Sequence, residues 1–435
     1  MPDPDDLIAK ALAEAGLPTE VPGAEEDDPL ARAFAAAGLK LPDTEPEPEP
    51  DPDEEVEKAL ADVQKRGPAV VAERAPEDDG AVEVPRWPAG TATAVGSMPG
   101  TDPREAAAIV AGELPGMPAL PELPARGAGS DMIGRTGALL VDLPLELKAG
   151  RWTVASRPGK DRRRAIDVLR GDMDAFDEAC DPVRPEFVKI AVAGPWTLAA
   201  AVELRTGHRV ITDRGAVREF AQSLTEGLRQ HVAEVAARRE AAVVVQLDEP
   251  ALPAVLAGTL PTPSKLGTVD AVPEPEVADL LREVVGVLTG IGSPVVVHCC
   301  AEDAPLTLLR DTGATALGID ATLPSLSGPT ATVAALDAVG EVWDAGVPLL
   351  LGIVPNVDPR KPVTSRKLAE RAFELADRLG FARERLAELA VPTPSCGLAG
   401  ADPAWAKQAL QLCREIGEGF VDPPEGDADE VDGEK

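Results

Sequence analysis

The chain has 435 residues and a formal net charge of −33. The charge is concentrated at the two ends: residues 1–85 hold 24 acids and 7 bases, and residues 421–435 hold 7 acids and 1 base. Residues 86–420 hold 44 acids and 34 bases, a far more even balance. Because neutralising phosphates requires clustered lysine and arginine, this distribution argues against binding to nucleic acid or to an anionic membrane.

Other bulk features predict a cytoplasmic protein with reduced thiols. No apolar stretch approaches the roughly 20 residues that a membrane span needs. The N-terminus, MPDPDDLIAK, lacks the basic start and the apolar run of a secretory signal. The five cysteines are odd in number and scattered along the chain, which is not typical of a disulfide framework.

The acidic head, residues 1–85, contains a repeat. Residues 5–17 read DDLIAKALAEAGL and residues 27–39 read DDPLARAFAAAGL, with a weaker copy, DEEVEKALADV, at 53–63. Acids before apolar residues at helical spacing are typical of short helices, whereas the Pro-Glu stretches between them should be extended. We expect a mostly disordered head, either solubilising or docking a protein partner through its repeats, and a disordered tail at 421–435.

The core, residues 86–420, alternates β-rich and helical segments. Strands are expected at 91–97, 118–123, 187–194, 242–248, 294–299, 316–320, 348–354 and 389–394. Several of them are continuous apolar runs, as expected of parallel strands covered on both faces. Helical patterns such as 216–240, 275–292 and 365–380 separate them. The alternation predicts an α/β fold, a (β/α)8 TIM barrel, with an insertion between the second and third strands.

Polar residues that could carry chemistry fall at the carboxyl ends of these strands, where barrels place their active sites. Asp248 ends the fourth expected strand, His298 and Cys300 end the fifth, Asp320 ends the sixth, and Cys396 follows the eighth. Because His298 and Cys300 are two positions apart, their side chains should leave the same face. An imidazole, two thiolates and a carboxylate are a suitable set of zinc ligands. The alternative is that these cysteines and this histidine pack in the core.

The other histidines and cysteines have weaker patterns. Cys413 lies in an amphipathic helical pattern and is expected in the core, and Cys180 is expected in an irregular acidic stretch. His208 and His231 are expected at the surface.

Several motifs together resemble the catalytic barrel of cobalamin-independent methionine synthase. They are VGSMPGTD (95–102), QLDEPAL (246–252), HCC (298–300), the acid Asp320 and PSCGL (394–398). GPWTLAA (194–200) also resembles a segment shared with uroporphyrinogen decarboxylase relatives. The resemblance spans roughly 90–420. It is closest to the short, single-barrel branch of the superfamily, which lacks the additional N-terminal barrel of the full-length synthase.

The resemblance implies a zinc-dependent methyl transfer to a thiol, most simply from a methyl donor to homocysteine to give methionine. It implies a zinc site made of His298, Cys300, Asp320 and Cys396, with Asp320 standing where the family has glutamate. It also implies a substrate site, in which Asp248 holds the amino group of homocysteine and the segment Gly96–Ser97 receives its carboxylate.

Two departures concern the methyl donor. Ile353 stands where the family has the histidine of H-S-P-N, which helps to protonate the departing folate, and AGSDMIGR (128–135) replaces the G-E-P-x-R segment. The acceptor side is therefore better retained than the methylfolate side. The resemblance leaves two donors open, methyltetrahydrofolate and methylcobalamin or another methylated corrinoid carrier. Trp196 could stack on a flat donor or could pack in the core.

Two other functions remain open from the sequence. One is a decarboxylase-like relative of the same superfamily that acts on a tetrapyrrole. The other is a non-catalytic, regulatory barrel whose acidic head recruits a protein partner.

Overall fold

The structure, a computed structural model, describes residues 84–423. The repeats of the acidic head and nearly all of the acidic tail lie outside these residues, so the disorder and the docking role expected of them stay predictions.

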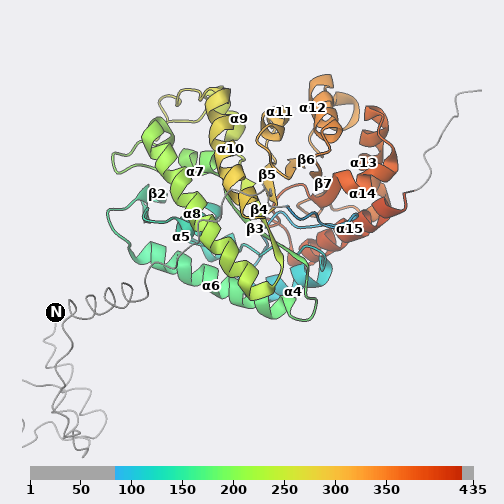
Figure 1. Ribbon diagram of the computed structural model, residues 1–435, viewed down its shortest axis with the longest axis horizontal. Helices are drawn as coiled ribbons and strands as arrows, with labels where there is room; N and C mark the ends of the chain where they lie inside the picture. Colours follow the sequence, from blue (N-terminus) through green and yellow to red (C-terminus); the bar gives the residue numbers. More distant parts are fainter. Residues whose placement is uncertain (1–83, 424–435) are drawn as a thin grey trace, which may run out of the picture. The chain divides into compact units, whose positions relative to one another are not determined.

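Helices and strands alternate through the described residues (Figure 1). The helices are α4 (Pro103–Glu113), α5 (Met132–Leu139), α6 (Lys160–Cys180), α7 (Pro195–Ala201), α8 (Arg214–Arg239), α9 (Leu252–Ala257), α10 (Glu274–Gly290), α11 (Leu306–Arg310), α12 (Val333–Asp344), α13 (Ser365–Leu379), α14 (Leu386–Leu389) and α15 (Pro403–Val421). The strands are β1 (Leu145–Lys148), β2 (Arg151–Val154), β3 (Phe187–Ala193), β4 (Ala242–Asp248), β5 (Val295–Cys299), β6 (Ala316–Asp320), β7 (Leu349–Val354) and β8 (Ala390–Pro394). Between residues 84 and 423, no helix is long and apolar enough to cross a membrane.

A parallel sheet of six strands forms the centre of the fold. Its order, β3-β4-β5-β6-β7-β8, follows the chain, and helices connect successive strands. All six strands are fully or almost fully buried, because helices cover them as Figure 1 shows. The six strands predicted from residue 187 onward are confirmed, with bounds that agree to within one residue. The fold is therefore an α/β fold of TIM-barrel-like organisation.

The first two predicted strands are wrong as regular strands. Residues 91–97 and 118–123 are extended segments with isolated bridges and no continuous ladder. Pro118 and Pro121 lie in the second segment. Because proline has no backbone N–H, it removes donors that a regular ladder needs.

These two segments nevertheless lie between β8 and β3, the two edges of the six-stranded sheet. Backbone contacts link them in turn: Thr93 N donates to Pro392 O at 3.3 Å, Ser97 pairs with Glu122, and Ala119 pairs with Lys189. They occupy the places that an eight-stranded barrel gives to its first two strands.

The inner face of the sheet changes from apolar to polar along the strands. At the amino ends, one cluster fills the interior: Met117, Phe187, Val244, Val296, Ala316, Leu350 and Val391. Side chains alternate along a strand, so the residues two positions further on face the same interior. They are polar or small: Lys189, Gln246, His298, Gly318, Gly352 and Thr393. The apolar floor supports a polar layer directly below the carboxyl ends of the strands.

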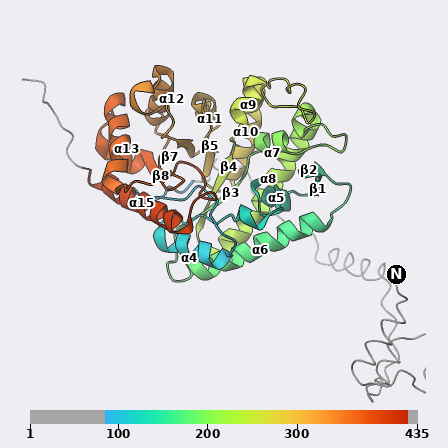
Figure 2. The same ribbon diagram turned by 180° about the vertical axis from the view of Figure 1, so that it is seen from behind.

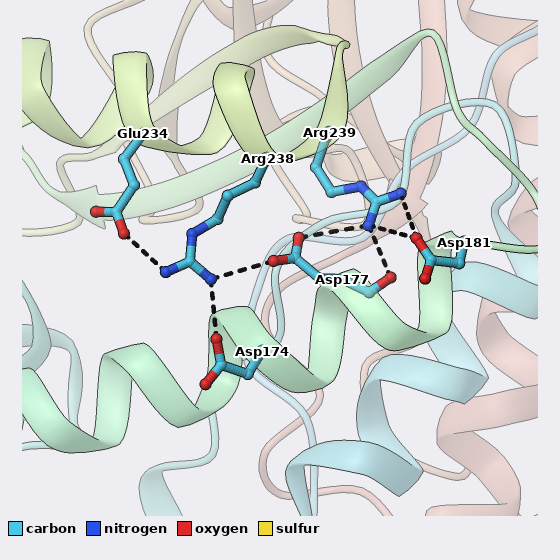
Figure 3. A network of polar contacts seen from close by, with 6 residues as sticks. All are labelled: Asp174, Asp177, Asp181, Glu234, Arg238 and Arg239. Carbon is cyan, nitrogen blue, oxygen red and sulfur yellow. Dashed lines mark hydrogen bonds and ion pairs between the residues drawn. The ribbon is translucent and has the colours of Figure 1, made fainter.

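The predicted insertion before β3 is confirmed. It consists of α5, the antiparallel pair β1–β2 and the long helix α6, which gather on one side of the sheet (Figure 2). Helix α6 is joined to α8 by a network of ion pairs (Figure 3). Its members are Asp174, Asp177 and Asp181 on α6 and Glu234, Arg238 and Arg239 on α8. Arg239 is buried, but most of the other members are exposed or partly exposed, and such ion pairs contribute little singly.

Two predictions about isolated residues are wrong. His231 is buried in α8, because it lies on the same helical face as Leu228 and Val235, which pack in the core. Cys180 is the buried last residue of α6. The core position of Cys413 in α15 is confirmed.

Candidate active site

A buried histidine and a buried aspartate meet across two neighbouring strands. Asp248 of β4 is in register with His298 of β5, and its Oδ1 lies 2.6 Å from His298 Nδ1. Because a carboxylate accepts, Nδ1 carries the proton and Nε2 keeps its lone pair for another partner. The ring fits because the residue beside it is glycine: a Cβ atom at Gly318 would lie 2.8 Å from His298 Cδ2.

Two cysteines from distant parts of the chain face each other at the same end of the sheet. The Sγ atoms of Cys300, after β5, and Cys396, after β8, lie 3.2 Å apart, and both residues are partly exposed. The hydrogen bond from the Cys300 thiol lowers the pKa of Cys396 to about 6. The same bond, together with burial, raises the pKa of Cys300. The contact between the two sulfurs therefore moves the pKa values of the two thiols in opposite directions.

The second predicted strand-end acid, Asp320, is bonded within its own turn. Oδ1 of Asp320 accepts from Thr322 N at 2.8 Å and from Thr322 Oγ1 at 2.6 Å. Burial raises the pKa of this carboxyl, and the two hydrogen bonds from Thr322 oppose the rise. Asp320 is thus held by its own turn.

The four predicted zinc ligands are gathered at one end of the sheet but are not arranged around one point. His298 is bonded to Asp248, the two cysteines to each other and Asp320 to Thr322. Across residues 84–423, no group of three or more histidine, cysteine or acidic side chains is arranged to hold a metal ion.

The predicted carboxylate-binding segment lies against the turn that carries Cys396. Ser97 O accepts from Leu398 N at 2.8 Å. A Cβ atom at Gly397 would lie only 2.1 Å from Ser97 Oγ, so this close approach depends on glycine. Residues predicted to bind substrate and to bind zinc are therefore neighbours.

Three polar residues near the site escaped the sequence analysis. Lys189 of β3 is 0% exposed, and its Nζ donates to Val95 O at 2.9 Å and to Gln246 Oε1. The Nε2 of Gln246, on β4, donates to Asp248 Oδ1 at 2.8 Å and to Val95 O at 2.9 Å. The feature of the sequence that could have revealed these two residues is the presence of a lysine and a glutamine inside otherwise apolar strands.

The third missed residue is Glu122, near the end of the second extended segment. Its side chain is 6% exposed, and its Oε1 would be 3.6 Å from a Cβ atom at Gly96. Burial raises the pKa of Glu122 to about 7; nearby Arg135 lowers it and Asp248 raises it. Glu122 therefore lies beside Gly96, close enough to Asp248 and Lys189 for their charges to interact.

The residues that the sequence linked to the methyl donor have structural roles in the fold. Trp196 is 1% exposed and donates from Nε1 to Val277 O at 3.2 Å, so it packs in the core. Ile353 is fully buried in the apolar core. Asp131, in the segment 128–135, caps α5 by accepting from Gly134 N at 3.0 Å.

The chain matches the family described as the catalytic domain of cobalamin-independent synthase over residues 89–418. It belongs to this family. The chain is therefore an enzyme of the methyltransferase class, as the motifs predicted.

Solved structures and curated proteins were compared as well. A B12-independent methionine synthase from Shewanella sp. W3-18-1, in complex with selenomethionine, is 13% identical, with a TM-score of 0.48 over 76% of this chain and 97% of that chain. A methyltransferase from Methanosarcina mazei is 16% identical, with a TM-score of 0.46 over 76% of this chain and 94% of that chain. No curated protein matches this chain.

Proposed function

We propose that this cobalamin-independent synthase domain transfers a methyl group to the thiol of homocysteine, giving methionine, and that it uses zinc. The observation that carries the proposal is the meeting of Cys300 and Cys396, 3.2 Å apart, at the end of the sheet where His298 presents a free Nε2. Family membership supplies the reaction class, and this set of groups supplies the reason for a thiol acceptor.

The donor groups fit zinc in kind. Two sulfurs and one imidazole nitrogen are the ligands that zinc prefers, and the bond from Asp248 orients the imidazole as such sites require. Asp320 would be the fourth ligand; it is the weakest member, because Thr322 already binds its Oδ1. Bound zinc would favour the thiolate form of a substrate thiol, which is the nucleophile.

The side chains around this centre would bind and orient the amino acid. Asp248 keeps Oδ2 available for the ammonium group, and Glu122 adds a second carboxyl on the same side. Gly96 and Ser97 would receive the carboxylate, next to the turn that carries Cys396. Holding the thiol in one place converts the methyl transfer into an effectively unimolecular step.

The methyl donor is methyltetrahydrofolate or a methylated corrinoid carrier. Two observations favour the corrinoid. Isoleucine at position 353 leaves the folate side without the acid that the family's histidine supplies, and the burial of Trp196 leaves it without an aromatic platform. We also propose that the protein acts in the cytoplasm. Its chain would divide into a head at 1–85, a closed eight-stranded barrel at 86–420 and a tail at 421–435. The head would dock a protein partner.

An assay with purified full-length protein, homocysteine and either methyltetrahydrofolate or methylcobalamin tests the proposal. We expect methionine from at least one donor. Absence of methionine with both donors, at a measured zinc content of one per chain, would contradict it. Turnover of a porphyrinogen instead would favour the decarboxylase alternative.

A further inference from the structure

A fully buried lysine lies in the polar layer beneath the proposed substrate site. Lys189 is 0% exposed, and burying an ammonium group is costly unless it is well bonded. Its Nζ donates to Val95 O at 2.9 Å and to Gln246 Oε1, and Asp248 and Glu122 are the acids whose charge reaches it. Lys189 contacts neither the thiols nor the imidazole, so the chemistry proposed above does not use it directly.

The lysine fixes the direction of a hydrogen-bond chain. An ammonium group only donates, so the side-chain oxygen of Gln246 must face Lys189. The amide nitrogen of Gln246 then faces Asp248 and donates to its Oδ1 at 2.8 Å. Oδ1 also accepts from His298 Nδ1 at 2.6 Å, which leaves the proton on Nδ1. Lys189 thus fixes the orientation of the Gln246 amide, and the carboxylate of Asp248 fixes the direction of the bond from His298.

A second branch of this chain of hydrogen bonds reaches the part of the proposed substrate site that would bind the carboxylate. Val95 O accepts from Lys189 Nζ at 2.9 Å and from Gln246 Nε2 at 2.9 Å. Val95 directly precedes Gly96 and Ser97. Because the segment 91–97 is not in a regular ladder, these two bonds supply restraint that a strand would otherwise receive from its neighbours.

We propose that Lys189 is a positioning residue: through Gln246 and Val95 it aligns Asp248 with the Gly96–Ser97 segment, and so keeps Asp248 in place to accept from His298. The part that concerns homocysteine rests on the proposed function, whereas the alignment of Asp248 with His298 is a property of the metal-free protein.

The bond between His298 and Asp248 can be followed through the His298 tautomer, by nitrogen–proton NMR of the imidazole rings in the full-length protein. Metal is first removed with a chelator, because zinc on Nε2 would itself keep the proton on Nδ1. The chain has only three histidines, and His298→Gln identifies the signal. We expect the Nδ1-protonated form in the wild type and a mixture of tautomers in Lys189→Met. Val244→Ala, a buried change in the apolar floor of β4, is the matched control and should keep the wild-type signal. An unchanged tautomer in Lys189→Met would overturn the proposal.

A second variant tests the proposal even if Lys189→Met fails to fold. Gln246→Glu keeps an acceptor for Lys189 but, as a carboxylate, cannot donate to Asp248 or to Val95 O. We expect Gln246→Glu to give a mixture of His298 tautomers. We also expect it to weaken homocysteine binding, measured by calorimetry, about tenfold, which corresponds to ~1.4 kcal/mol. A wild-type tautomer together with wild-type homocysteine affinity in Gln246→Glu would overturn the proposal. A changed tautomer in a protein that makes no methionine would instead uphold the positioning role and reject the methyl transfer.

Discussion

The imidazole of His298 donates from Nδ1 to Oδ1 of Asp248 across 2.6 Å, on adjacent strands in register. One residue proposed to hold zinc is therefore oriented by one residue proposed to hold substrate. A change at either residue should affect both metal and substrate, and the predictions below use this coupling.

Metal binding should depend on cysteine position and not merely on cysteine number. We expect Cys396→Ser and His298→Ala to lose the zinc that the wild type retains after dialysis, as measured by elemental analysis. Cys299→Ala is the matched control, because Cys299 is adjacent to the proposed ligand Cys300 but packs in the apolar core. Loss of zinc in Cys299→Ala alone, or in none of the three, would contradict the assignment.

Removing the charge of Asp248 should weaken the binding of homocysteine. Charge-assisted hydrogen bonds are worth about 1.5–3 kcal/mol, so Asp248→Asn should raise KM roughly tenfold or more. Asp344→Asn, an exposed change at the end of α12, should leave KM unaltered. Equal KM values for Asp248→Asn and the wild type would reject the role of Asp248 in binding the amino group.

Only glycine at position 318 should leave enough room for the imidazole of His298. An alanine there would place Cβ 2.8 Å from His298 Cδ2, so the ring must move away from its position on Asp248. We expect Gly318→Ala to lower zinc affinity. In Gly286→Ala, on α10, the new Cβ meets nothing within 4 Å, so metal binding should stay unchanged and stability should rise by about 0.5–1 kcal/mol. Equal zinc affinity in the two variants would show that the ring is free to shift.

The stability of the core should fall in mild acid because of His231. Burial, with smaller effects of Arg135 and Arg238, lowers its pKa from 6.5 to about 4. The folded state therefore favours the neutral ring, and its contribution to stability is present above about pH 6.5 and is lost as the pH falls toward 4. The loss amounts to about 3 kcal/mol at most.

Denaturant unfolding of the wild type and of His231→Leu at several pH values checks this expectation. The difference between the two free energies of unfolding should shift in favour of His231→Leu between pH 6.5 and 4, because leucine does not titrate. A difference that stays constant with pH would place His231 in contact with water.

Most of the sheet could be predicted from the sequence, because buried parallel strands are short apolar runs between helical patterns. The segments at 91–97 and 118–123 could be located from the sequence, but they could not be distinguished from regular strands. Pro118 and Pro121 replace ladder donors, and pairing with β8 and β3 is a matter of tertiary contact.

The site was predictable where it depended on position along a strand. His298, Cys300 and Cys396 lie at or just after the carboxyl ends of their strands, where the order of predicted strands placed them. The link from Lys189 through Gln246 to Asp248 was not predictable, because it requires the register of β3 against β4 and the approach of Val95. His231 was missed because an amphipathic pattern does not reveal how much of a long helix is covered.

The most direct test of the central claim is the rate of methionine formation from homocysteine and a labelled methyl donor, compared among wild type, Cys396→Ser and Cys299→Ala in the full-length protein. We predict labelled methionine from the wild type and from Cys299→Ala, and a loss of at least a hundredfold in Cys396→Ser, which is about 2.8 kcal/mol. Equal rates in the wild type and Cys396→Ser would contradict a reaction that depends on the paired thiols.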